Sequence, residues 1–333
     1  MTDSLERDLR AANPLRSRRT DPLSARAEAD LASILSGDAA PAAAVTPLRP
    51  KRRAARFAWA LAAVAALTAA TVITVTTLSV NTPPSVAAPP ALDATPIDEP
   101  LDAVIDRLAS LAEEHIPAGS SLEQVLDYEA WYSDVTITPT ETTHYVQPVE
   151  IRQVRHADLS GTFTTTAGRI RWGTPPPDGS AYEPGSIISE DTFAAGEFPT
   201  IYPTPPPTDA AEMRDYFAVA SWDPDATSGE WFAAIESLAY DWKLDGPQTA
   251  AVLEFISTLP GVEVAGYVTD RLGRDGIAIT TTTRLDGAFT DTLIFDSSTG
   301  RLLSSEQVYR GGLKQLDIPY PTVFSYVAWK ETP

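Results

Sequence analysis

An apolar segment of 24 residues, Phe57–Val80, limits the architectures open to this chain more than any other feature. It contains only apolar residues, threonine and serine, and as a helix it would extend about 36 Å at about 1.5 Å per residue. The hydrocarbon core of a bilayer is about 30 Å thick. A helix buried in a protein core would be shorter and would have a polar face. The segment therefore predicts a transmembrane helix that contacts the lipid bilayer.

Such a segment is either a retained anchor or a cleaved signal peptide. The apolar part of a signal peptide usually has about 7–15 residues and lies near the N-terminus, whereas 56 residues precede Phe57–Val80. The triplet Ser85–Ala87 resembles a cleavage site but directly follows two prolines. Length therefore favours an anchor. Arg and Lys crowd its N-terminal side, so we expect residues 1–56 in the cytoplasm and residues 81–333 outside, in a single-pass protein of the cell membrane.

The net charge of −20 is unevenly distributed along the chain. Residues 1–56 hold eleven Lys and Arg against seven Asp and Glu, a net charge of +4, while residues 57–333 hold fourteen against thirty-eight, a net charge of −24. A body this acidic repels phosphate backbones, so we expect no nucleic acid partner. The chain has no cysteine, which excludes disulfide frameworks, cysteine nucleophiles and thiolate metal sites.

The two segments that flank the apolar segment differ in kind. On the cytoplasmic side, Asp21–Gly37 has helix start and stop signals, and the apolar residues from Leu23 to Leu35 share one face. That face predicts a cytoplasmic protein partner or contact with the membrane surface, and an inert helical tail is the alternative. On the other side, residues 81–100 contain six prolines, which predicts a stiff extracytoplasmic spacer.

Residues 101–333 carry the patterns of a folded α+β domain. The helical patterns have apolar residues three and four positions apart, and the strand patterns are rich in aromatic, β-branched and threonine residues. Helices are expected at Leu101–His115, Asp209–Ala220, Thr227–Leu244 and Gly246–Gly261. Strands are expected at Tyr128–Pro139, His144–Ala157, Ser160–Gly173, Ser186–Phe193, Val262–Asp270, Gly276–Leu285, Ala288–Asp296, Arg301–Arg310 and Thr322–Trp329.

The last five strands follow one another closely, which predicts an antiparallel meander. Asp286-Gly287 reads as a tight hairpin turn and Asp296–Gly300 as a longer one. Neither the early nor the late strands can cover their own apolar faces and edges. We therefore expect one curved antiparallel sheet that packs against the helices, in spite of a proline-rich crossing at residues 173–207.

The sequence contains no convincing catalytic, metal or cofactor site. The three histidines, His115, His144 and His156, lack the spacing of zinc ligands, and no nucleophile or phosphate-loop motif is present. The stretch Asp223–Glu230 resembles a calcium loop but lacks its glycine and its final glutamate, so helix capping explains it better. Glu190, Asp191 and Glu197 are expected to be solvated. We predict no catalytic residues and no cofactor.

A resemblance begins at Leu259–Tyr309. The motifs Leu259-Pro260-Gly261-Val262, Val268-Thr269-Asp270 and Gly276-Ile277-Ala278, with Asp296 and Thr299–Leu303, resemble the C-terminal part of an actinobacterial family of uncharacterised single-pass membrane proteins. Trp131–Thr138 and Asp8–Pro14 resemble that family's first exported strand and cytosolic start. Members are often encoded near extracytoplasmic-function sigma factors, which implies a signalling or regulatory role. The order of strands and helices also looks like the lipoprotein-carrier half-barrel, a likeness of fold alone.

These observations lead to one preferred function and two alternatives. The preferred one is a non-enzymatic sensing, regulatory or interaction module of the cell envelope, linked to sigma-factor signalling. A binding or carrier domain for a lipid or other apolar ligand is the second, and a deep apolar pocket would favour it. An enzyme is the third, which a cleft with carboxylates and His144 or His156 would favour.

Overall fold

The computed structural model describes residues 88–119, 121–132, 145–173, 181–313 and 319–330. Every described residue belongs to the second of the two units into which the chain divides, Ala58–Pro333. The expected cytoplasmic tail, the segment Phe57–Val80 and His144 lie outside the described residues, so they remain predictions. Among the described residues, no helix combines the length and the apolar character needed to cross a bilayer.

The described part of the chain forms four α-helices, two 3₁₀ turns and eleven strands. The helical elements are α4 (Leu101–His115), η1 (Ala210–Glu212), α5 (Met213–Ala218), α6 (Ser228–Ala239), α7 (Gly246–Ser257) and η2 (Arg284–Gly287). The strands are β1 (Gln124–Tyr132), β2 (Tyr145–Val146), β3 (Val149–Arg155), β4 (Gly161–Ala167), β5 (Trp172–Gly173), β6 (Ile187–Phe193), β7 (Val262–Thr269), β8 (Asp275–Thr281), β9 (Phe289–Asp296), β10 (Leu302–Tyr309) and β11 (Thr322–Lys330).

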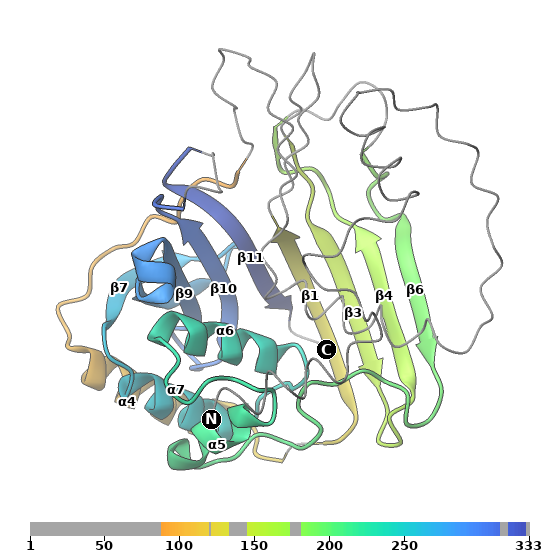
Figure 1. Cartoon of the computed structure of the whole chain (residues 1–333), viewed down its shortest axis with the longest axis horizontal. Coiled ribbons are helices and arrows are strands. Elements are labelled where there is room, and N and C mark those ends of the chain that lie inside the picture. The colour runs from red at the N-terminus through yellow and green to blue at the C-terminus, as the bar shows by residue number, and fades with distance from the viewer. Residues whose placement is uncertain (1–87, 120, 133–144, 174–180, 314–318, 331–333) are drawn as a thin grey trace, which may run out of the picture. The chain divides into compact units, whose positions relative to one another are not determined.

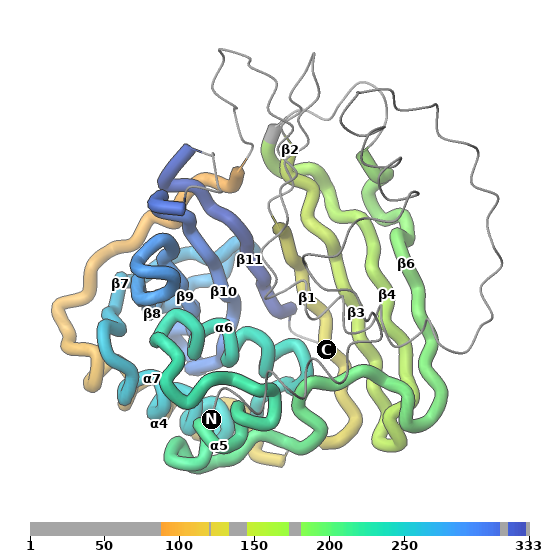
Figure 2. Tube along the Cα trace, in the orientation of Figure 1, coloured from red at the N-terminus to blue at the C-terminus, as the bar shows by residue number. Residues whose placement is uncertain are grey.

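Nine of these strands join in one antiparallel sheet, in the order β6-β4-β3-β1-β11-β10-β9-β8-β7. The early and the late strands meet only at the β1–β11 ladder, which runs from Asp127 opposite Lys330 to Tyr132 opposite Ser325. Strands β2 and β5 form a separate pair. Figures 1 and 2 show the sheet curving around the helices. The prediction of a curved antiparallel sheet in an α+β domain is confirmed.

The helices gather on the half of the sheet that contains β7–β11, whereas β3, β4 and β6 extend beyond them (Figure 1). Capping fixes where α6 and α7 begin, because Thr227 with Glu230 and Asp245 with Gln248 each form a capping box. Trp231, Ile235 and Leu238 on one face of α6, and Trp242 just after this helix, are all at most 2% exposed. Burial of this face against the sheet forms the core.

Residues 88–97, which we call the strap, run along the opposite face of the sheet as far as the β7 edge, and Ile97 at their end packs against the main core. Leu92 packs against an apolar cluster that includes Val268 and Leu303. Farther along, Thr95 exchanges backbone hydrogen bonds of 2.9 and 2.8 Å with Tyr267 of the edge strand β7. The described part of the expected spacer is therefore docked on the domain from residue 88 onward. An extended proline-containing chain can do this because its carbonyls, and the N–H groups it retains, remain free to pair with a sheet edge.

One expected turn is wrong and another is confirmed. Strands β8 and β9 are antiparallel neighbours, but η2 connects them instead of a two-residue Asp286-Gly287 turn. Leu285 and Asp286 adopt left-handed conformations there, with φ of 49° and 55°. The turn Asp296–Gly300 does join β9 to β10, and the Asp296 carboxylate accepts the N–H groups of Ser298 and Thr299.

Candidate ligand-binding cavity

The residues that the sequence raised as possible ligands or catalysts do not converge in the described structure. His115 is exposed at the end of α4, and His156 is exposed just after β3. In the stretch Asp223–Glu230, Thr227 caps α6, as the capping explanation predicted. Glu190 and Asp191 are exposed on β6 and Glu197 is exposed nearby, as expected for solvated side chains. Within the described ranges, no three His, Asp or Glu side chains are close enough to hold a metal ion.

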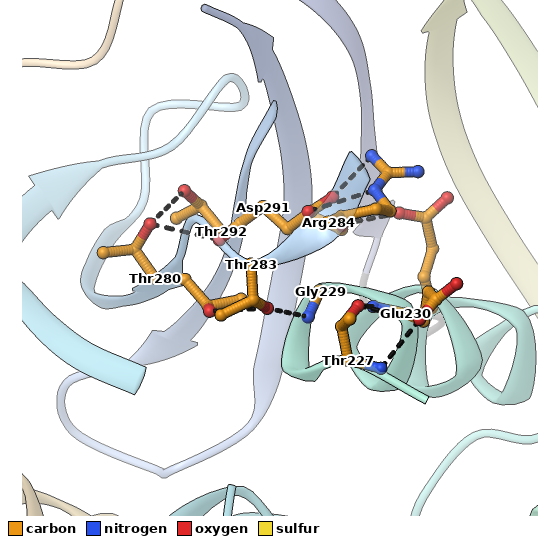
Figure 3. Close-up of polar contacts among 11 residues, drawn as sticks. Thr227, Gly229, Glu230, Thr280, Thr283, Arg284, Asp291 and Thr292 are labelled. Atoms are coloured by element: carbon orange, nitrogen blue, oxygen red, sulfur yellow. Dashed lines mark hydrogen bonds and ion pairs between the residues drawn. The ribbon is translucent and has the colours of Figure 1, made fainter. Parts of the chain in front are cut away.

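A polar cluster lies where α6 begins, beside β8 and β9 (Figure 3). Arg284 binds Asp291 with two hydrogen bonds, of 3.1 Å from Nε and 2.6 Å from Nη2. The backbone N–H of Gly229 donates to the Thr283 hydroxyl at 2.8 Å. A side chain at Gly229 would collide with Arg284 and Asp291, since an added Cβ would lie 2.7 Å from each. These contacts dock the first turn of α6 on the sheet, which is a structural role.

Of two acids near this cluster, Asp291 is buried and Glu236 is half-buried. Burial raises the pKa of Asp291 to about 6, although the charge and hydrogen bonds of Arg284 oppose the shift. Burial also raises the pKa of Glu236, which accepts hydrogen bonds from Ser305 at 2.5 Å and from Tyr240 at 3.1 Å. Both carboxylates are thus engaged by donors of the domain itself, and no histidine lies among their described partners.

A cavity lies elsewhere, at one end of the β1–β11 ladder, and we call it the seam cavity. It has a volume of about 170 Å³ and is lined by β1, the end of β11, the start of β10 and the α6–α7 connection. The connection is fixed to β1 because the backbone N–H of Lys243 donates to the Gln124 side chain at 2.8 Å. The apolar residues of the lining are Val125, Leu126, Ala239, Trp242, Leu244, Leu302 and Trp329.

Two tryptophans give the seam cavity aromatic walls. Trp242 is 2% exposed, and its indole N–H donates to the Tyr202 carbonyl at 2.9 Å. Trp329 is 9% exposed and packs against Tyr240, with 5.9 Å between the ring centroids. The indole N–H of Trp329 is buried without a hydrogen-bond acceptor. Because buried donors are nearly always paired, an acceptor on a bound molecule would relieve this cost.

Charge distinguishes the seam cavity from the rest of the domain. Three cations, Lys243, Arg301 and Lys330, line it together with a single carboxylate, Asp127. That carboxylate already accepts a hydrogen bond of 2.8 Å from Arg152. Lys330 reaches Glu150 at 2.9 Å, in a pair that is largely exposed and therefore weak. Residues 57–333 carry a net charge of −24, so an excess of cations around one cavity is a local inversion of the charge.

Trp242 of this cavity falls within the expected helix Thr227–Leu244, but α6 ends at Ala239 and Trp242 is buried in the connection that follows it. Trp329 was expected only as the last residue of the strand Thr322–Trp329, and Lys330 had no predicted role. The lining comes from segments between residues 125 and 330 that meet only because β1 pairs with β11. No local pattern in the sequence signals such a meeting.

Comparisons with known proteins leave the family open. The chain matches no family model. It matches no curated protein either. The resemblance to the actinobacterial membrane family therefore stays an expectation.

Solved structures give weak likenesses. MucB in complex with MucA(peri) matches at 11% identity with a TM-score of 0.27, over 69% of this chain and 53% of that one. MucB alone matches at 11% identity with a TM-score of 0.25, over 69% of this chain and 56% of that one. A putative outer membrane lipoprotein-sorting protein domain from Vibrio parahaemolyticus matches at 9% identity with a TM-score of 0.20, over 70% of this chain and 90% of that one. This chain thus spans about half the length of the MucB chains, and at such TM-scores the likenesses do not extend to function.

Proposed function

We propose that this chain is a single-pass protein of the cell membrane whose exported, non-enzymatic domain binds an anionic amphiphile in the seam cavity. Binding would be the input of a sensing module, and the cytoplasmic tail would pass the signal to a protein partner. The segment Phe57–Val80 would be the anchor, with residues 1–56 inside and the domain outside. A sigma factor is the tail partner that the sequence resemblance implies.

The observation that carries the proposal is the combination of aromatic walls with three cations. An anionic head group gains attraction from Lys243, Arg301 and Lys330 in a partly enclosed site, where charges are screened less than on an open surface. An apolar chain gains burial against Trp242 and Trp329, at about 25 cal/mol per Å² of apolar area. A neutral apolar ligand would gain only from apolar burial, and a small hydrophilic anion only from charge attraction.

The size of the cavity limits how much of the ligand it holds. Pockets for whole drug-sized ligands usually measure about 300–1,000 Å³, and the seam cavity has a volume of about 170 Å³. It can therefore take a head group with the adjoining part of one chain. The remainder of the amphiphile would lie outside, as expected for a lipid that is sensed without being extracted completely from its surroundings.

The test uses the full-length chain in nanodiscs of zwitterionic phosphatidylcholine, with decanoate as the probe and decanol as its uncharged counterpart. Binding is measured by calorimetry after subtraction of empty nanodiscs. We expect decanoate to bind at least about tenfold more tightly than decanol, equivalent to about 1.4 kcal/mol. Replacing both Lys243→Gln and Lys330→Gln should remove most of that preference.

A matched control replaces a cation outside the cavity. Arg169 is exposed and does not line the cavity, so Arg169→Gln changes the net charge of the domain without changing the site. Decanoate affinity should be unaffected by it. Equal affinities for decanoate and decanol, or equal losses in Arg169→Gln and in the lysine variants, would contradict the proposal.

A further inference from the structure

Arg155, the last residue of β3, is a buried cation whose donors are incompletely used. The residue is 3% exposed, and its guanidinium carbon lies 4.3 Å from the centroid of the Trp242 ring. Its Nε and Nη2 atoms are buried and have no hydrogen-bond partner among the described residues. Arg155 also forms no ion pair with any described residue. Stacking on an aromatic ring satisfies the face of a guanidinium but leaves its N–H edge unsatisfied.

The carboxylate that attracts Arg155 does not fill this edge. Asp241 opposes the lowering of the Arg155 pKa by burial, so its negative charge acts on the guanidinium. Its hydrogen bonds, however, come from the backbone N–H groups of Ile201 and Tyr202, at 2.7 and 2.8 Å to the same oxygen. Burying a charged donor without an acceptor is unfavourable, because the group loses its hydrogen bonds to water and gains none in return. The fold therefore tolerates a cost at Arg155 that a bound acceptor would remove.

Other arginines of this domain show which chemical group the unpaired N–H edge of Arg155 can bind. Arg271 binds Glu306 through Nε and Nη2, and Arg284 binds Asp291 through the same two atoms. Arg274 binds Asp270 in the same way. Arg284 meets both oxygens of Asp291, which is the bidentate geometry that guanidinium favours, whereas Arg271 and Arg274 each direct the two N–H groups to one carboxylate oxygen. Arg155 presents the same pair of atoms without the carboxylate.

We propose that the Nε–Nη2 edge of Arg155 is a binding site for an oxyanion, a carboxylate or phosphate group that does not belong to the described chain. The site is separate from the seam cavity, although Trp242 contributes to both, and it does not depend on the proposed function. Because both nitrogens are buried, the oxyanion gains access only when the chain above Arg155 opens locally. Once bound, it stabilises the closed domain by mass action.

The test compares thermal unfolding of the full-length chain in sodium acetate, sodium phosphate and sodium chloride, at millimolar concentrations and equal ionic strength. We expect acetate or phosphate to raise the midpoint in a saturable way that chloride does not reproduce. A response to acetate alone identifies a carboxylate, and a response to phosphate alone identifies a phosphate group. Arg155→Lys keeps the charge but loses the paired N–H edge, so it should lose the response.

Arg152→Lys is the control, because Arg152 lies on the same strand, is exposed and binds Asp127 through Nη1. It should keep the full response. Should Arg155→Lys fail to fold, the Nε–H nuclear magnetic resonance signal of Arg155 in the wild-type chain provides a second measurement, since it must shift on addition of acetate or phosphate. A wild-type chain with no response beyond that of chloride, or a response retained in Arg155→Lys, overturns the proposal and leaves ordered water at this edge.

Discussion

Tyr128 of β1 lies directly opposite Trp329 of β11, which joins the first strand of the domain to its last. The same ladder places Ala130 opposite Val327, and both residues are at most 1% exposed. Because the early and late strands meet nowhere else in the sheet, the cohesion of its two halves depends on this ladder and on the helices that cover it. The seam cavity lies at the end of the same ladder, so stability and binding share one structural element.

Cooperative unfolding is the first prediction. If the β1–β11 ladder makes the domain one unit, the amides of residues 145–167 and of residues 262–309 should lose hydrogen-exchange protection at the same denaturant concentration. The measurement is native-state hydrogen exchange across a urea series. Clearly different concentrations for the two sets of amides would mean that the halves unfold independently, in spite of their shared sheet.

Local patterns explain why much of the fold could be predicted. Thr227 with Glu230, and the apolar spacing of Leu101–His115, are contained within a few residues, and the structure has helices at both places. The incompletely covered faces and edges of the early and late strands required a joint sheet. Which strands would pair could not be derived, because the register of Asp127 with Lys330 depends on packing between segments that are distant in the sequence.

Tertiary contact also explains the features that sequence reasoning missed. Composition alone predicts a proline-rich spacer at residues 81–100. The docking of the strap depends on the pairing of Thr95 with Tyr267, which the sequence does not signal. The left-handed Leu285 and Asp286 lie in η2, which Arg284 holds to Asp291. The candidate cavity had no local signal, because its cations are ordinary surface residue types until the fold brings them together.

Trp231 should be a major contributor to stability. It is 1% exposed, meets Phe255 edge to face with 5.5 Å between the ring centroids, and lies beneath the Arg214 guanidinium at 5.1 Å. Trp231→Ala should lower the free energy of unfolding by about 3–5 kcal/mol, the usual cost of removing a buried large aromatic side chain. Trp222→Ala is the matched control because Trp222 is only half-buried, so its effect in urea denaturation should be clearly smaller. Equal losses would place Trp231 outside the core.

Asp241 should make stability depend on pH. Burial raises its pKa from 3.8 to about 6, although hydrogen bonds from Tyr202 and Ile201 and the charge of Arg155 oppose the shift. The folded state therefore holds the proton more tightly than the unfolded state. The stabilisation is complete below the unfolded-state pKa and is lost as the pH rises through the folded-state pKa. A shift of roughly 2 pKa units corresponds to about 3 kcal/mol.

Asp241→Asn removes this titration and keeps an oxygen that can accept the two backbone N–H groups. The free energy of unfolding of the wild-type chain, minus that of Asp241→Asn, should therefore fall by about 3 kcal/mol between pH 3 and pH 7. Urea denaturation at a series of pH values measures this difference. Parallel curves for the two proteins would show that Asp241 titrates alike in the folded and unfolded states.

The last prediction concerns the docking of the strap. Gly266 of β7 has φ of 137°, and a Cβ added there would lie 2.1 Å from the Thr95 carbonyl oxygen. Gly266→Ala therefore adds a collision with the strap to the cost of an unfavourable backbone conformation. Gly273→Ala separates the two effects, since Gly273 has φ of 84° with no atom near the added Cβ. Both variants should lose about 1–3 kcal/mol through backbone strain. Only Gly266→Ala should also speed hydrogen exchange at the Thr95 amide, which donates to Tyr267. Unchanged exchange at Thr95 in Gly266→Ala would mean that the strap stays docked without this close approach.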